Sequence, residues 1–160
     1  MRRNERGATI LEAALALSLL FLILIGIMGF AVVFANYQTV TNAAREGARY
    51  AVAPPIDADT LPSSAIIAQK ACSYLPNSLA IPTCASYDGT KTPPALTKCL
   101  MLGGPAPTAN DVYVTQCTVA QPNGLPSLVY TEVDIRNSLK LPIIPQISLN
   151  TTAAMRNETN

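Results

Sequence analysis

Gly7, Ala8 and Glu12, near the start of the chain, have types and spacing that could do chemistry. Cleavage after Gly7 would turn Ala8 into a new N-terminal amine and make Glu12 the fifth residue of the shortened chain. Glycine suits a cleavage site because, without a side chain, it can lie flat in a protease cleft. A carboxylate at the head of an apolar segment is costly, roughly 2.5–3.5 kcal/mol on insertion scales. We therefore expect Glu12 to have a partner, and a free amine would be suitable.

The element that positions these residues is a long apolar segment. The run from Ala13 to Ala35 contains no charged residue and spans roughly 35 Å as a helix, enough for a bilayer core of about 30 Å. The leader Met1–Gly7 is rich in arginine, which predicts a cytoplasmic N-terminus and an exported remainder. An ordinary secretory signal is the alternative, but its apolar core is usually shorter, about 7–15 residues. We expect a retained membrane anchor.

The helical pattern continues beyond the apolar run. Small or apolar residues recur with helical spacing at Val40, Ala43, Ala44, Gly47, Ala48 and Ala51. The sequence predicts a single helix from about Thr9 to Val52, ending before Pro54-Pro55, because a residue that precedes proline disfavours the helical conformation. Its second half is either a juxtamembrane linker or a stalk that packs inside an assembly.

The composition changes at Pro54, since all 13 prolines lie at or beyond it. The sequence thus predicts a leader at residues 1–7, a transmembrane and stalk helix at 8–53, and an exported domain at 54–160. In the exported part, helical spacing predicts a short amphipathic helix over Leu61–Leu75, closed by Pro76. The following segment, Asn77–Asn110, is rich in proline and glycine and is expected to be a loop.

Three segments alternate apolar and polar residues as strands do. They are Asp111–Ala120, Leu128–Ile135 and Gln146–Arg156, with a predicted turn at Pro122-Asn123-Gly124 between the first two. The predicted fold class is α+β, with a long N-terminal helix, a short helix and a three-stranded antiparallel sheet packed on one face.

Two features of the exported part allow more than one interpretation. Glu132 and Asp134 share one strand face, where they form either an acid pair or part of a solvated surface. We expect the solvated surface. The apolar turn Leu139–Pro145 either caps the core or presents a contact to a neighbouring subunit.

Four cysteines, Cys72, Cys84, Cys99 and Cys117, all lie in the exported part, and an even number outside the cytoplasm favours two disulfides. Three connectivities are possible. Sequential pairing is our first choice, because short loops close most readily. Each bridge would fasten a loop, and a closed loop of about 15 residues contributes roughly 3 kcal/mol. Free buried thiols are the remaining alternative.

Catalysis has little support in the composition. The chain has no histidine, so the commonest general base and Ser/His or Cys/His pairs are missing. The cysteine spacings match no zinc template. With a net charge of +1 and no clustered basic face, nucleic-acid binding is not expected. We expect no enzymatic activity, no cofactor and no resident metal.

The N-terminal pattern resembles a type IV prepilin processing site. Together with the long apolar helix and the segment Asn42–Arg49, it is similar to the N-terminal region of TadE-like proteins, the minor pilins or pseudopilins of tight-adherence (Flp-type) pilus systems. The C-terminal segment Ile147–Glu158, which closes in Arg-x-Glu, also resembles the ending of this family.

The resemblance implies a single-pass membrane subunit that acts in pilus biogenesis and surface adherence. Its implied partners are the inner membrane, a prepilin peptidase cutting between Gly7 and Ala8, other pilins and the Tad secretion machinery. Glu12 would accept the Ala8 amine of an adjacent subunit. The alternative is a membrane-anchored extracytoplasmic binding or adhesion module outside any filament.

Overall fold

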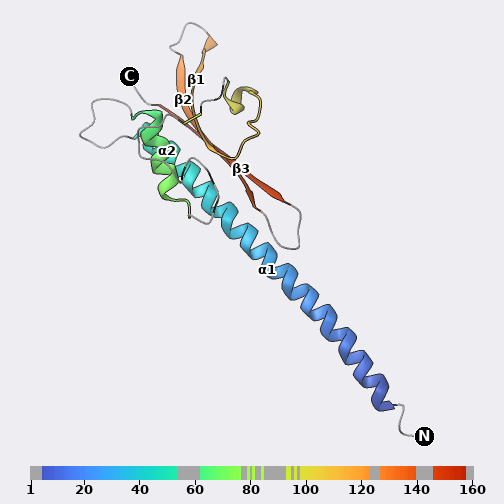
Figure 1. Cartoon of the computed structure of the whole chain (residues 1–160). Helices are drawn as coiled ribbons and strands as arrows, with labels where there is room; N and C mark the ends of the chain where they lie inside the picture. The colour runs from blue at the N-terminus through green and yellow to red at the C-terminus, as the bar shows by residue number, and fades with distance from the viewer. Residues whose placement is uncertain are drawn as a thin grey trace. The chain divides into compact units, whose positions relative to one another are not determined.

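A computed structural model of the chain describes residues 5–53, 62–76, 79, 81, 84, 93–94, 96, 98–122, 127–139 and 146–157. Its elements are α1 (Glu5–Val52), α2 (Ser64–Ser73), the 3₁₀ helix η1 (Leu100–Leu102), β1 (Val112–Val119), β2 (Leu128–Leu139) and β3 (Ile147–Arg156), most of which are labelled in Figure 1. The α+β class, with a long N-terminal helix, a short helix and a three-stranded antiparallel sheet, is confirmed.

The chain divides into two compact units, Met1–Asn36 and Tyr37–Asn160, and the division falls inside α1. The boundary expected at residue 53 rests on the change in composition at Pro54, and it stays a prediction. The first unit contains the whole apolar run Ala13–Ala35 of α1. The second contains residues 37–52 of α1, together with α2, η1 and the sheet.

α1 begins at Glu5, slightly earlier than the sequence predicts, and ends at Val52 as predicted. The helix has no proline to interrupt it, and its many alanine and leucine residues favour helical backbone. At its C-terminal end the N–H of Ala53 donates to the carbonyl of Arg49 (3.0 Å). The Arg49 side chain is in the last turn, where a cation interacts favourably with the helix dipole.

α2 is shorter than the predicted segment Leu61–Leu75. It begins after Ser63, whose extended backbone makes it the N-cap, and ends at Ser73. The N–H groups of Tyr74 and Leu75 then donate to Ala71 and Cys72 in a closing turn that precedes Pro76. Leu61 itself lies outside the described residues.

The sheet has the order β1-β2-β3, and both pairs are antiparallel. Val114 pairs with Val133, which pairs with Ala153 on the other side. β2 runs to Leu139, four residues beyond its predicted end, because β3 continues to pair with it as far as Leu139–Ile147. The polar residues that follow Ile135 break the apolar alternation but do not end the strand.

Most of the expected turns fall where the structure gives no description. Asn123 and Gly124, and residues 140–145 of the apolar turn, lie outside the described residues, as does Glu158. Among the described residues of the predicted loop 77–110, the short 3₁₀ helix η1 closes at Gly103 with a positive φ of 74°.

The core of the second unit lies between the helices and one face of the sheet. It is built from small α1 residues, α2 residues and sheet residues that are all buried, namely Ala43, Ala44, Ala48, Ile67, Ala68, Ala71, Val112, Val114, Val133 and Ile135. The small residues of α1 let the backbones of α1 and α2 approach closely, and the two helices lie side by side in Figure 1.

The opposite face of the sheet corrects our expectation of a solvated surface. Glu132 and Asp134 are each only 1% exposed, so this face is covered. The segment around η1 lies over it, and backbone N–H groups of Leu100 and Met101 reach the Glu132 carboxylate. The sheet is therefore packed on both faces in this region. The alternation of apolar and polar residues in β2 correctly predicted which face Glu132 and Asp134 share. It did not predict the segment that covers this face.

Candidate functional site

α1 carries the three residues singled out at the start of the chain. Gly7, Ala8 and Glu12 are all helical and exposed. The Gly7–Ala8 bond lies in the first turn of the helix, where backbone N–H groups have no intrahelical acceptor and the turn opens easily. A Cβ placed on Gly7 would meet nothing within 4 Å. Packing within the chain therefore does not require glycine at this position.

Glu12 has no basic residue one helical turn away. The positions three and four residues before and after it hold alanine, threonine and leucine, so the helix surface supplies no cation to pair with its carboxylate. A partner for this charge has to come from outside its own helical face. The arrangement can accept a hydrogen bond or pair with an amine, and it contains no second group for acid–base catalysis.

The surrounding helix is apolar and unburied. Large side chains from Ile10 to Phe34 are exposed all along the first unit. Within the described residues, this is one helix long and apolar enough to cross a membrane. A helix that is apolar all around is typical of a membrane span or of a buried core, and the span window of this helix is unburied in the described part of the chain.

The second half of α1 has a different role. In the segment Asn42–Arg49, the residues Ala43, Ala44, Gly47 and Ala48 are buried, whereas Arg45 and Arg49 are exposed. The small residues of this segment form a packing surface for α2 and the sheet. Their pattern is therefore explained by the fold of the second unit.

Glu132 on β2 organises the covered face of the sheet. Its Oε1 accepts the N–H of Leu100 at 3.0 Å and its Oε2 accepts the N–H of Met101 at 3.2 Å. These are amides at the start of η1, where no intrahelical acceptor is available, so the carboxylate replaces a side-chain cap. We did not foresee this role, because backbone amides leave no sign in the sequence.

The turn that follows η1 depends on glycine. A Cβ on Gly104 would lie 2.2 Å from the carbonyl oxygen of Lys98 and 2.7 Å from that of Cys99. The N–H of Gly104 donates to the same Cys99 carbonyl (2.9 Å). The close approach of these backbones explains Gly104, whereas the positive φ of 74° explains Gly103.

Asp134 forms the second polar cluster on this face. Its carboxylate accepts from Nε of Arg136 and from the hydroxyl of Thr152, each at 2.8 Å. The sequence contained a signal for the first partner, because residues i and i+2 of a strand share a face. Asp134 is buried, Arg136 is partly exposed, and the carboxylate has two hydrogen-bond partners, which is the condition for tolerating a buried charge.

Tyr113 lies directly opposite Asp134 across the β1–β2 pair. Burial raises the pKa of its phenol above the usual value of 10.0, and the negative charges of Asp111 and Asp134 raise it further, while Arg136 opposes them. Its hydroxyl donates to the carbonyl of Ala109 (3.3 Å). Protonated Tyr113 therefore holds the segment before β1 against the sheet.

Two disulfides fasten the loops to the rest of the second unit. Cys72 is bonded to Cys84, and Cys99 is bonded to Cys117. This connectivity joins neighbours in the sequence, the pairing that short loop length favours. The first bridge links the end of α2 to the chain after it, and the second links the residue before η1 to β1. Cys99 and Cys117 lie next to Glu132, which makes this cluster the candidate metal-ligand set among the described residues.

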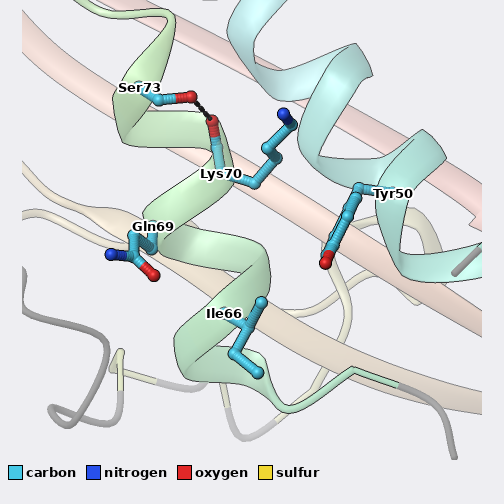
Figure 2. Close-up of a pocket in the computed structure, with 5 residues that line it drawn as sticks. All are labelled: Tyr50, Ile66, Gln69, Lys70 and Ser73. Carbon is cyan, nitrogen blue, oxygen red and sulfur yellow. Dashed lines mark hydrogen bonds between the residues drawn. The ribbon is translucent and has the colours of Figure 1, made fainter. Parts of the chain in front are cut away.

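A shallow hollow of about 340 Å³ lies on the surface of the second unit. Figure 2 shows the residues that line it, which are Tyr50 on α1 and Ile66, Gln69, Lys70 and Ser73 on α2. The Lys70 ammonium lies 5.9 Å from the ring centroid of Tyr50 and 5.4 Å from that of Tyr74. The Ser73 hydroxyl donates to the Lys70 carbonyl. These contacts hold Lys70 in place, and they do not form a set of converging catalytic groups.

Comparison with known proteins gives one family. The family model described as TadE-like protein matches residues 7–49, from Gly7 to the end of the small-residue segment of α1. The resemblance noted from the sequence is thereby confirmed for this part of the chain. No curated protein and no solved structure matches the chain.

Proposed function

We propose that this chain is a minor pilin-like subunit of a Tad (Flp-type) pilus system, acting in pilus biogenesis and surface adherence. The family match carries the proposal, because it begins at Gly7 and includes Ala8, Glu12, the apolar run Ala13–Ala35 and the small-residue segment. The match to this family supports a pilus context. The more specific role of a processed subunit rests on the chemistry of the first residues.

The first step of the proposed mechanism is cleavage by a prepilin peptidase between Gly7 and Ala8. The scissile bond lies in an exposed helical first turn, which a protease can unwind at small cost. Gly7 is not required by packing, since a Cβ there would find open space. The fit of a residue without a side chain into the protease cleft then explains why glycine is found at position 7. The arginine-rich leader stays on the cytoplasmic side, and the second unit is exported.

The second step is recognition between subunits. The Glu12 carboxylate accepts the new amine of Ala8 from an adjacent subunit, and the pairing of one carboxylate with one amine fixes the axial register. The exposed apolar side chains of the first unit leave the bilayer only when neighbouring subunits cover them. The chain has no enzymatic role in this mechanism and needs no cofactor.

The intact mass of the chain recovered from its membrane tests the proposal. We expect a mature protein that starts at Ala8. Gly7→Leu should leave the precursor uncut, because the added side chain blocks the cleft. Gly26→Leu is a matched control, since Gly26 lies in the same helix and also has nothing within 4 Å of a Cβ. It should be cut normally.

The opposite outcomes are equally clear. A mature chain that begins at Asn36 or later would identify an ordinary secretory signal. An uncut wild-type chain in a host with an active prepilin peptidase would instead favour an anchored binding module that never joins a filament.

A further inference from the structure

The side chains of Cys99, Cys117 and Glu132 converge beneath the segment around η1. Their sulfur atoms and a carboxylate oxygen all lie within 4.8 Å of one another. The three residues are 3%, 4% and 1% exposed, so the cluster is buried. The pairing of β1 with β2 and the position of Cys99 before η1 bring the three residues together. Their spacing in the sequence resembles no metal motif.

Glu132 differs from Asp134 in its electrostatic partners. Asp134 pairs with Arg136, whereas no basic side chain in the described part of the chain forms an ion pair with Glu132. The Glu132 carboxylate is held by two backbone N–H groups, one on each oxygen, and each oxygen has a further lone pair available. A buried carboxylate with no ion-pair partner among the described residues, next to two cysteine sulfur atoms that become thiols on reduction, is a set of donors suited to a thiophilic metal ion.

We propose that, when the Cys99–Cys117 bridge is reduced, Cys99, Cys117 and Glu132 bind a thiophilic divalent cation of the Zn²⁺ type. Two thiolates and one carboxylate supply three ligands, and water takes the fourth tetrahedral position. The Cα atoms of the two cysteines are 6.0 Å apart. Tetrahedral sulfur ligands about 2.3 Å from zinc lie roughly 3.8 Å apart, so side-chain rotation is enough to open the site.

The chemistry requires a reductant, and a dithiol supplies it by thiol–disulfide exchange. The S–S bond between Cys99 and Cys117 breaks, the dithiol is oxidised to a disulfide, and its two protons pass to the protein sulfurs. The cation then displaces these two protons into solvent. The bound metal takes over the mechanical role of the bridge, because it joins the residue before η1 to β1 and to β2.

Absorption spectroscopy with Co²⁺ as the probe tests the site in the full chain in detergent. A Cys72→Ser/Cys84→Ser variant, reduced with a phosphine, has thiols only at the proposed site. We expect thiolate-to-cobalt charge-transfer bands that saturate at one Co²⁺ per chain, with release of two protons. The oxidised chain should give no such bands. Glu132→Gln in the same background should weaken binding at least roughly tenfold, because it removes a charged ligand.

The wild-type chain reduced at both bridges gives a measurement that does not depend on folding of the double variant. Its Co²⁺ bands should be lost largely in Cys99→Ser/Cys117→Ser, which keeps the Cys72 and Cys84 thiols as a generic dithiol control. Equal binding by that control, unchanged affinity in Glu132→Gln, or no bands in the reduced wild-type chain would each overturn the proposal. None of these outcomes bears on the pilus role.

Discussion

Gly47 of α1 lies against Ala71 of α2 so closely that a Cβ on Gly47 would be 3.0 Å from the Ala71 Cβ and 3.5 Å from a Val133 methyl group. Three elements of the second unit meet at this point. The glycine costs helix propensity, about 1 kcal/mol relative to alanine. The close approach of the two helices explains why a residue without a side chain is nevertheless found there.

Substitutions at Gly47 should therefore separate the effect of helix propensity on stability from the effect of side-chain packing. We expect Gly47→Ala to change the free energy of unfolding little, because the gain in propensity offsets a tight contact. Gly47→Val should destabilise the second unit by about 1–3 kcal/mol through overpacking. Thermal unfolding of the full chain in detergent measures both. Asn42→Val, at an exposed position of the same helix, controls for β-branching, and an equal loss there would refute the packing argument.

Glu132→Gln should weaken the hydrogen bonding that fixes η1 to the sheet. The amide has one acceptor oxygen and an NH₂ group, which cannot accept from a second backbone N–H. Loss of a charged acceptor costs about 1.5–3 kcal/mol. Hydrogen exchange should accelerate in a peptide that covers Leu100 and Met101. Glu46→Gln, a partly exposed carboxylate on α1, should change stability by less than about 0.5 kcal/mol. Unchanged exchange at η1 would mean that the two hydrogen bonds are not what holds it.

The polar face of the sheet shows where prediction from the sequence succeeds and where it fails. Alternation in β2 correctly places Glu132 and Asp134 on the side opposite Val133 and Ile135. The segment that covers them has no periodic pattern, and it is held by backbone amides, a close glycine contact and a disulfide. Such contacts depend on the folded backbone, so the sequence could not reveal them.

The first helix was easier to predict. α1 has no proline and an uninterrupted apolar run, and it ends before Pro54, so its residue pattern determines both its type and its end. The end of β2 was harder, because pairing with β3 carries Arg136, Asn137 and Ser138 into the strand despite their polarity. The roles proposed for Gly7, Ala8 and Glu12 depend on other molecules. The sequence predicts them only through the chemistry of these residues and the family resemblance.

Tyr113 should make stability fall in alkaline solution. Its pKa is raised in the folded protein, so the folded state keeps the proton at a pH where the unfolded chain releases it. The resulting stabilisation is complete below about pH 10 and is lost as the pH rises through the folded pKa. Spectrophotometric titration should show one tyrosine that ionises late and disappears in Tyr113→Phe. Tyr74→Phe, which removes an exposed ring hydroxyl, should leave that late component in place.

Glu12 gives the prediction that tests the assembly mechanism itself. Glu12→Gln keeps the size of the side chain and most of its hydrogen bonding, but it removes the charge and lowers the cost of remaining in the bilayer. We expect the variant to be made, cut after Gly7 and held stably in the membrane, yet to fail to support pilus assembly and surface attachment. Glu12→Asp should be intermediate, because the charge survives with a shorter reach.

A carboxylate elsewhere on α1 provides the control for this loss of charge. Glu46 lies in the helix segment that packs within the second unit, so the Glu46→Gln variant should support normal piliation. Electron microscopy of the cell surface, combined with the mature mass of each variant, separates failure of processing from failure of assembly. If Glu12→Leu cells were normally piliated, the carboxylate could not be the acceptor for a neighbouring amine. The prepilin-like start would then serve only as a route to the membrane for an anchored binding module.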